Sequence, residues 1–473
     1  MKTKIFIILL ILVSACKVKQ EYVRDTSNLP ENFRNQVVKD TLNVANIPWK
    51  KFFKDSLLVA LIDTALSENI PLNIAARDIL IVQEQLLQKK ANFFPTLTTS
   101  PEFYGENHSV NRYSSPNSKY YKDKEIPDFM FVSRRQYLIP FRSTWEADIW
   151  GKLARMKEST QAKLAGTLAE YQALQTDLVA EVAISYYNLL VLDEQLKVAQ
   201  TNLALTQNTL DLTKLQFKAG MVTSLAIQQT ENQLLNATAL IPKIQREINR
   251  EENYLKSLMG QFPGKINREP NLDGERFSEK IFTGTPMDLL RNRPDIQADE
   301  YNLIAAYADA DVAKANRYPT LALKADLGLD SQIFGVLFNP IGSLYATFSS
   351  SLLTPIFQNR KLKTAENIAK IEKSQAADQF RNTLVKAVKE VSDEVNNIEK
   401  LEEEYLIASE RLANAKKAVQ NAALLYKSGM ANYLEVINAQ SNALNNEMAL
   451  FDIRLDILTA NIQLYRKLGG GWN

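Results

Sequence analysis

The residue types that most often carry catalysis or hold metals are nearly absent from this chain. Its 473 residues include one cysteine, Cys16, and one histidine, His108. A disulfide needs two cysteines and a Cys/His zinc site needs several such ligands, so the composition excludes both. The sequence contains no Gly-x-Ser-x-Gly, no His-Glu-x-x-His and no phosphate-binding loop motif. We therefore expect no catalytic residues, no metal site and no cofactor, and we expect His108 to be a solvated loop residue of the polar segment 107–135.

The chemistry that the sequence does favour is acylation of Cys16. Lys2 and Lys4 precede an apolar run over 5–13, which is too short to span a bilayer, and Val-Ser-Ala directly precedes the cysteine. This arrangement resembles a bacterial lipobox, in which the cysteine is acylated and becomes the first residue. The alternative is an ordinary signal peptide followed by an incidental cysteine. We predict that 1–15 is a lipoprotein signal peptide and that the mature chain is exported and anchored to membrane lipid through acylated Cys16.

The overall composition excludes several functional classes. Lys and Arg total 56 against 54 Asp and Glu, and removal of the two lysines in the signal peptide leaves the counts equal. Such a balance favours no nucleic-acid partner. Charged residues make up 23% and the mean hydropathy is −0.23, so the chain is not a polytopic helical membrane protein. The low contents of Gly and Pro, 15 and 16 residues, favour long uninterrupted elements.

The sequence contains an internal duplication. Ala-Asn-x-x-Pro-Thr-Leu occurs at 91–97 and again at 315–321, and Phe-Lys-Ala-Gly-Met at 217–221 corresponds to Tyr-Lys-Ser-Gly-Met at 426–430. A period above 200 residues indicates a duplicated domain, not a solenoid. We predict structural repeats over 56–260 and 291–469, flanked by an N-terminal segment 16–55, a linker 261–290 and a tail 470–473.

Each repeat is expected to contain one very long helix. In the second repeat seven apolar residues recur at intervals of seven, and six of the seven equivalent positions in the first repeat are also apolar. A sustained seven-residue period indicates side-by-side helix packing as in coiled coils. The rods expected over 152–218 and 361–427 would each be roughly 100 Å long. The second stripe comprises Leu384, Val391, Ile398, Tyr405, Leu412, Val419 and Tyr426.

Both rods are expected to end at a glycine and to be followed by a returning helix. Gly220 and Gly429 follow basic last turns and suit the left-handed position that closes a helix. Each repeat is therefore a long antiparallel hairpin, with a further helical stretch before its rod. The return helices are expected over 224–259 and 433–468, and the earlier stretches over 56–91, interrupted at Pro71, and over 294–316.

Four strands are expected between these helices, near 95–106, 136–150, 319–331 and 343–356. In the second and third, apolar and charged residues alternate with period two, which is typical of a strand with one apolar and one polar face. A half-buried strand in a soluble sandwich would show the same pattern. If the strands cross a bilayer, four are too few to close a barrel and an open edge is forbidden in lipid, so the chain must oligomerise. A trimer would supply twelve strands around a wet lumen.

With these features the chain resembles the TolC-like outer-membrane efflux proteins, in their lipidated branch. The resemblance covers roughly 50–470 and rests on Arg-Asn-Arg-Pro-Asp-Ile at 291–296, the lipobox, the repeated Ala-Asn-x-x-Pro-Thr-Leu, and 426–430 followed by Tyr-Leu-Glu-Val at 433–436. It implies a mainly α-helical fold with a membrane β-barrel. Duplicated helical hairpins would form a trimeric α-barrel tunnel, and four strands per protomer would contribute to a twelve-stranded barrel, with an equatorial belt built from 16–55, 261–290 and the C-terminal end.

The resemblance also implies a function, a location and partners. The chain would be a passive exit duct for small molecules, anchored in the bacterial outer membrane with a long periplasmic portion. It would work as a homotrimer with a periplasmic adaptor and an inner-membrane pump. A periplasmic adaptor or structural lipoprotein with coiled-coil hairpins is the alternative, but one hairpin with compact β domains would be expected for an adaptor. A lipid-anchored hydrolase would need a nucleophile and a base, which the sequence lacks.

Two sets of site residues follow from the resemblance. The tips of the hairpins are expected to dock the adaptor, and their turns alone do not explain the apolar Met221, Val222 and Met430. The periplasmic gate is expected nine and six positions before Gly429, where the family's acidic residues are replaced by Gln420 and Ala423, so an acidic, cation-binding gate is not favoured. Asp211 is the first-repeat equivalent of Gln420 and is otherwise a solvated helix charge. The docking-tip residues are Gly220, Met221, Val222, Gly429, Met430 and Tyr433.

Overall fold

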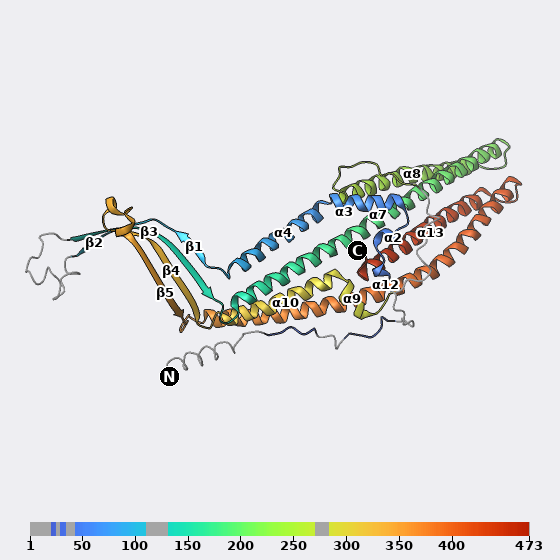
Figure 1. Ribbon diagram of the computed structural model, residues 1–473. Helices are drawn as coiled ribbons and strands as arrows, with labels where there is room; N and C mark the ends of the chain where they lie inside the picture. The colour runs from blue at the N-terminus through green and yellow to red at the C-terminus, as the bar shows by residue number, and fades with distance from the viewer. Residues whose placement is uncertain (1–19, 25–28, 35–42, 110–130, 270–282, 473) are drawn as a thin grey trace, which may run out of the picture. The chain divides into compact units, whose positions relative to one another are not determined.

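The computed structural model describes residues 20–24, 29–34, 43–109, 131–269 and 283–472. These residues form long helices and one antiparallel sheet (Figure 1). The chain divides into two compact units, each built from pieces of both repeats. Unit 1 contains 82–164 and 302–376, and unit 2 contains 24–81, 165–301 and 377–473.

Unit 1 carries the sheet. Its strands are β1 (Thr96–Thr99), β2 (Glu102–Ser109), β3 (Phe131–Ala147), β4 (Thr320–Ser331) and β5 (Leu344–Leu353). The order is β1-β3-β4-β5, with β2 also pairing with β3, so the first repeat and the second repeat meet between β3 and β4. Strand β4 is connected to β5 through η2 (Phe334–Val336) and α11 (Pro340–Ser343).

The register of the sheet places the apolar and the polar residues on opposite faces. Phe141 pairs with Leu327, and the next pair along the strands is Arg142 with Asp326. Because successive side chains alternate across a strand, the aromatic and aliphatic side chains share one face. Phe141, Leu327 and Phe348 are exposed on it and are not covered by any described part of this chain. On the other face Arg142 bonds Glu102, and Gln136 donates to Asp330 at 3.0 Å.

The expected first strand is divided in two. Strand β1 ends at Thr99 and β2 begins at Glu102, with Ser100 and Pro101 between them. Proline lacks the N–H that a ladder requires, which explains the break. Both pieces pair with β3, which begins at Phe131, earlier than the expected 136. The other differences at strand ends are three residues or fewer.

The two rods are single helices of equal length. Helices α7 (Lys152–Lys218) and α12 (Lys361–Lys427) each have 67 residues and return as α8 (Ser224–Leu258) and α13 (Tyr433–Lys467). The expected bounds of the rods agree with these, and those of the return helices differ by one residue. In unit 2, Ser185 donates to Glu251 at 2.5 Å in the first hairpin, and Lys416 pairs with Glu447 in the second. The seven-residue stripe of α12 is buried or half-buried along its whole length.

The hydrophobic core of unit 2 surrounds the middle of α7. Tyr186 and Tyr187 are fully buried there, together with Leu58 of α3 (Ser56–Glu68) and Ile462 of α13. Asp55 caps α3 by accepting from the backbone N–H of Leu57 at 2.7 Å, and it also accepts from the Tyr186 hydroxyl at 2.5 Å. The half-buried carboxylate therefore has a hydrogen-bond donor on each oxygen, which offsets the cost of its partial burial.

Residues before α3 pack against the C-terminal helix. The segment contains η1 (Val44–Asn46) and α2 (Trp49–Phe52). The Phe52 ring stacks on Tyr465 at 4.1 Å between centroids, and the Tyr465 hydroxyl donates to the Ile47 carbonyl at 2.6 Å. The segment before α3 is thus joined to α13 within unit 2.

Helix α3 is followed after one residue by α4 (Ile70–Ala91). The break falls at Asn69, whose side chain accepts from the Leu72 N–H at 2.9 Å, and Pro71 occupies the first turn of α4, where a proline is tolerated. In the described part of the chain no single helix meets the length and hydropathy needed to cross a membrane, whereas α3 and α4 taken together, with a 46° bend between them, do.

Besides short helices of three or four residues, the described part of the chain contains a helix that was not expected from the sequence. Helix α9 (Pro286–Asn292) begins inside the segment assigned to the linker and directly precedes α10 (Pro294–Ala315). Thr285 and Asp288 form a capping box at its start and Pro286 occupies the first position. These are helix-start signals that the sequence analysis did not use.

Candidate functional site

The two hairpin tips have the same backbone design. Gly220 and Gly429 have φ values of 74° and 75°, which a residue with a side chain adopts only at a cost. The N–H of Met221 donates to the Gln216 carbonyl at 2.9 Å, and that of Met430 donates to the Leu425 carbonyl at 2.8 Å. This Schellman arrangement satisfies the last carbonyls of each rod.

The apolar side chains expected at the tips differ in exposure. Met221 is 64% exposed and Met430 is 74% exposed, whereas Val222 is half-buried. The tips lie side by side, because a Cβ atom at Gly429 would be 3.8 Å from Met221 Cε. Tyr433 is half-buried and its hydroxyl donates to Gln229 of the first hairpin. The six docking-tip residues are therefore brought together on one end of unit 2.

Buried hydrogen bonds join the two hairpins just above the tips. Tyr426 is 1% exposed, and its hydroxyl lies 2.9 Å from Thr213 Oγ1. Gln216 Nε2 donates to the Tyr426 carbonyl at 3.3 Å. Further along, Gln440 Nε2 donates to Thr209 Oγ1 at 3.0 Å. From the sequence, Tyr426 was expected only to be an apolar residue of the seven-residue stripe. The sequence feature that could have indicated these hydrogen bonds is the spacing of the α7 threonines opposite Tyr426, which lie three and four residues apart.

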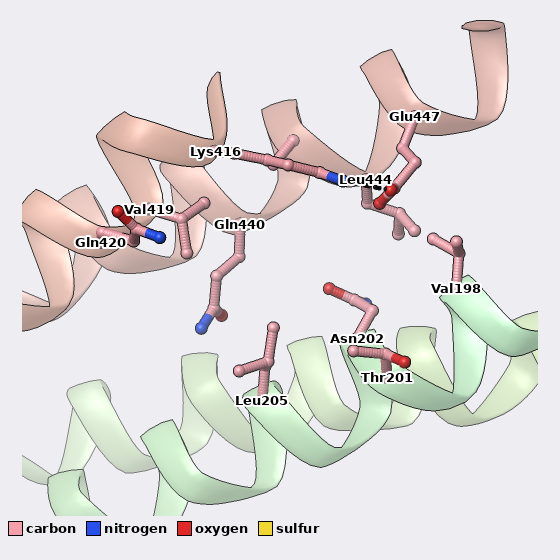
Figure 2. Close-up of a pocket in the computed structure, with 11 residues that line it drawn as sticks. Val198, Thr201, Asn202, Leu205, Lys416, Val419, Gln420, Gln440, Leu444 and Glu447 are labelled. Atoms are coloured by element: carbon pink, nitrogen blue, oxygen red, sulfur yellow. Dashed lines mark hydrogen bonds and ion pairs between the residues drawn. The ribbon is translucent and has the colours of Figure 1, made fainter. Parts of the chain in front are cut away.

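The three gate candidates are not gathered at one point. Gln420 is exposed and lines a cavity of about 410 Å³ between α7, α12 and α13, which Figure 2 shows. In the same cavity the Lys416 ammonium lies 2.5 Å from Glu447, and the buried Gln440 Oε1 has no hydrogen-bond partner among the described residues. Ala423 is exposed and does not line the cavity. Asp211 is also exposed and accepts from Gln207 Nε2 at 2.9 Å.

The Arg-Asn-Arg-Pro-Asp-Ile motif lies at the join between α9 and α10. Arg293 is buried and donates to Asp295 at 3.0 Å, to Glu390 at 2.9 Å and to the Lys467 carbonyl at 3.1 Å. Burial by itself favours the neutral forms of this ion pair, yet the attraction between its partners leaves the pKa of Arg293 raised and that of Asp295 lowered. The motif therefore ties the junction of α9 and α10 to α12 and to the end of α13.

The structure gives little on the two chemically reactive residues that the sequence singles out. Cys16 is not among the described residues. For His108 the structure gives the backbone, which pairs with Val132 between β2 and β3, so the residue is in a strand and not in the expected loop. Within the described ranges no group of three or more His, Cys, Asp or Glu side chains could hold a metal ion.

Comparison with known proteins shows which family and which relatives this chain resembles. The family model described as "Outer membrane efflux protein" matches residues 61–261 and 285–470. The chain is 27% identical over 464 residues to "Cation efflux system protein CusC" of Escherichia coli O6:H1 (strain CFT073), covering 97% of this chain and 96% of that protein. It is 28% identical over 425 residues to "Solvent efflux pump outer membrane protein SrpC" of Pseudomonas putida, covering 90% and 87%.

Solved structures show the same fold. The outer-membrane channel OprN matches with a TM-score of 0.87 and 24% identity over 97% of this chain and 100% of that one. A structure of CusC matches with a TM-score of 0.84 and 25% identity over 96% and 100%. The family match spans most of both repeats and confirms the predicted resemblance. The chain belongs to the outer membrane efflux protein family.

Proposed function

We propose that this chain is the subunit of a passive, trimeric exit duct that exports small molecules across the outer membrane as the outermost part of a tripartite efflux system. The observation that carries the proposal is a sheet with open edges and an exposed apolar face, continued by two 67-residue helices. Family membership supports this channel role over the alternative of a periplasmic adaptor, and it fits a protein that is not an enzyme.

The open edges are the reason for a trimer. Among the residues that the structure describes, β5 has a strand partner on one side only, as do β1 and β2, so the sheet ends in rows of unpaired backbone groups. Each such group costs several kcal/mol in lipid. If β5 pairs with β1 and β2 of the next copy, the edges disappear. Counting β1 and β2 as one interrupted strand, three copies supply twelve strands, an even number within the range of known barrels.

Adaptor docking is assigned to the tips. Methionine side chains at Met221 and Met430 stand in solvent beside one another, where they can adapt to a partner's helical hairpin. Gly220 and Gly429 set the turns, and Val222 and Tyr433 support them. We assign the equatorial belt to the N-terminal segment 16–55, the linker 261–290 and the C-terminal end. The packing of Tyr465 against Phe52 supports this assignment.

The gate is assigned to the region of Gln420, Ala423 and Asp211. Gln420 contributes a neutral amide to a cavity that also contains an ion pair, and Ala423 adds no charge. A gate without an acidic pair gives no preference for cations. The relatives are named for cations, solvents, toluene and antibiotics, so the duct fold itself does not select cargo and the pump partner does.

Lipid anchoring is assigned to Cys16. Metabolic labelling with a palmitate analogue should label the wild-type protein, whereas Cys16→Ser should not be labelled and should keep its signal peptide. Labelling of the variant would contradict the assignment.

The trimeric duct is tested by a cysteine pair at the two sheet edges. Thr98 in β1 and Ser349 in β5 lie three strands apart, about 14 Å, so they cannot form a disulfide within one chain. We expect Thr98→Cys with Ser349→Cys, or pairs shifted by two residues, to give disulfide-linked trimers. Thr144→Cys with Lys324→Cys is the control, because these residues pair directly between β3 and β4 and should bond within one chain.

The same preparations should give discrete conductance steps in a planar bilayer. Disulfides formed only within chains, together with a silent bilayer, would refute the trimeric duct.

A further inference from the structure

The four connections between strands and long helices are far more basic than the rest of the chain. We define the basic collar as residues 88–95, 148–157, 314–319 and 354–363. It contains ten Lys or Arg and one acidic residue, Asp148, whereas the whole chain has 56 basic and 54 acidic residues. The loop at the opposite ends of β4 and β5, residues 332–343, has no charged residue. Residues 110–130, between β2 and β3, carry four basic and three acidic residues, so most of the excess positive charge lies in the connections between the strands and the long helices.

The segments of the collar are tied together within unit 1. Trp145, near the end of β3 and three residues before the second segment, donates from Nε1 to the Phe93 carbonyl of the first segment at 2.9 Å. Trp150 donates to the Pro319 carbonyl at 2.7 Å and stacks on Tyr318 at 5.0 Å, which joins the second and third. These bonds make the collar one surface and not four independent turns.

Three of the ten basic side chains are already neutralised. Lys152 pairs with Glu146, Arg155 with Asp311, and Arg317 with Glu366 of α12. The last pair joins the third segment to α12, three residues after the end of the fourth segment. A hydrogen bond from Lys370 and, to a lesser extent, one from Arg317 hold the pKa of Glu366 below its usual value of 4.5. This carboxylate is therefore already paired with cations.

The other seven basic residues have no acidic partner within 4 Å in the part of the chain that the structure describes. Most of them are exposed, and three lie within four residues at the start of α12. Like charges gathered without counter-charges repel one another, and positive charge at a helix N-terminus is unfavourable as well. The arrangement is stabilised if an external anion binds. The seven are Lys89, Lys90, Lys157, Lys314, Arg360, Lys361 and Lys363.

Large apolar side chains stand beside these cations. Ile356 is 95% exposed and Phe357 is 83% exposed, four residues before Lys361, and Phe94 is 72% exposed, four residues after Lys90. A free phosphate would neutralise the cations but would leave these side chains in water. A phospholipid satisfies both, because its headgroup carries the negative charge and its acyl chains cover apolar surface.

We propose that the basic collar binds the headgroups of anionic phospholipids in the membrane leaflet at the strand-to-helix connections. The inference rests on the proposed placement of the strands in the outer membrane, since that placement brings the collar to the headgroup layer. A Lys or Arg near an anionic surface favours binding by about fivefold. Three free lysines therefore account for an enrichment of anionic over zwitterionic lipid of at least tenfold and up to about a hundredfold.

The test compares two variants with the same change of charge. The collar variant carries Lys90→Gln, Lys361→Gln and Lys363→Gln, which leaves the ion pairs of Lys152, Arg155 and Arg317 intact. The control variant carries Lys243→Gln, Lys386→Gln and Lys417→Gln, exposed lysines of α8 and α12 outside the collar. Full-length protein is reconstituted with equal amounts of phosphatidylglycerol and phosphatidylethanolamine. The lipids retained after mild detergent extraction are then counted by native mass spectrometry.

We expect wild type and the control variant to retain phosphatidylglycerol at least tenfold over phosphatidylethanolamine, and the collar variant to retain both within about twofold. Equal retention by the wild type, unchanged enrichment in the collar variant, or equal loss in both variants would overturn the inference. Conductance is recorded on the same samples. A conducting wild-type channel without lipid preference refutes only the collar, whereas a wild type that retains phosphatidylglycerol but does not conduct refutes only the duct.

Discussion

Removing the Tyr426 hydroxyl should loosen the contact between the two hairpins by a predictable amount. Thr213 Oγ1 donates to the Thr209 carbonyl at 2.8 Å, so its single proton is already used. The 2.9 Å bond to Tyr426 must therefore be donated by the tyrosine. Burial raises the pKa of the Tyr426 phenol, so the hydroxyl keeps the proton that it donates. Tyr426→Phe removes this donor and leaves the threonine's own bond in place.

The size of the effect follows from the burial of the pair. A neutral hydrogen bond contributes about 0.5–1.5 kcal/mol net, so Tyr426→Phe should increase local opening by about two- to tenfold. Thr213→Val should cost more, about 1–3 kcal/mol, because it leaves a buried tyrosine donor without an acceptor. The double variant replaces both partners by apolar groups and should be less destabilised than Thr213→Val alone.

The assay is hydrogen exchange measured by mass spectrometry on peptides covering 205–220 and 415–433 of the intact trimer. Local opening free energies set exchange rates directly, so the expected rate increases are those given above. Tyr405→Phe is the matched control, since the hydroxyl of this half-buried tyrosine of α12 has no hydrogen-bond partner within the described part of the chain. An unchanged rate in Tyr426→Phe, or a double variant that exchanges as fast as the product of the two single effects, would refute the reasoning.

The remaining predictions concern acid stability, the C-terminal turn and the gate. Hydrogen bonds from its two cationic partners lower the pKa of Glu366, so its contribution to stability is complete above the usual pKa of 4.5 and is lost as the pH falls through the lowered pKa. Glu366→Gln should therefore lower the melting temperature of the trimer at pH 7 and flatten the acid side of the curve of melting temperature against pH. A variant curve parallel to that of the wild type would contradict this. Gly469→Ala should destabilise the trimer more than Gly220→Ala, because a Cβ atom at position 469 would lie 2.3 Å from a backbone oxygen. A Cβ atom at position 220 would meet nothing within 4 Å, so that variant should cost only the left-handed backbone strain of about 1–2 kcal/mol. Equal melting temperatures of the two variants would be inconsistent with this packing. Gln420→Arg and Ala423→Arg should reduce single-channel conductance and shift ion selectivity toward anions, and unchanged conductance in both would remove these positions from the constriction.

Much of the helical fold could be predicted from the sequence, because it depends on the preferences of residues close together in the chain. A seven-residue apolar period without internal proline, closed by a basic turn and Gly220 or Gly429, determines where each rod begins and ends, and the helices agree to within one residue. Strand β4 was equally clear, since alternation over twelve residues marks one strand. The break at Pro101 and helix α9 also have local causes and could have been predicted from proline chemistry and the Thr285–Asp288 capping box.

The candidate site at the hairpin tips could be predicted from the sequence only in part. The glycine turns and exposed methionines follow from the sequence around each tip, but their contact with one another does not, because residues 209 positions apart meet only through packing of the hairpins. The hydrogen bond between Tyr426 and Thr213 could not be predicted from the sequence for the same reason. A tyrosine on an apolar stripe gives no sign that its hydroxyl will find a partner on another helix.

The sequence by itself determined the duplicated rods, the turn glycines and the two-faced strands, because these follow from periodicity and backbone preference within a few residues. The tertiary structure decided how the repeats share one sheet, which charges Arg293 neutralises, and which basic residues of the collar remain unpaired. Those outcomes depend on contacts between segments far apart in the chain, where the partner of a side chain is set by packing and not by its neighbours in sequence.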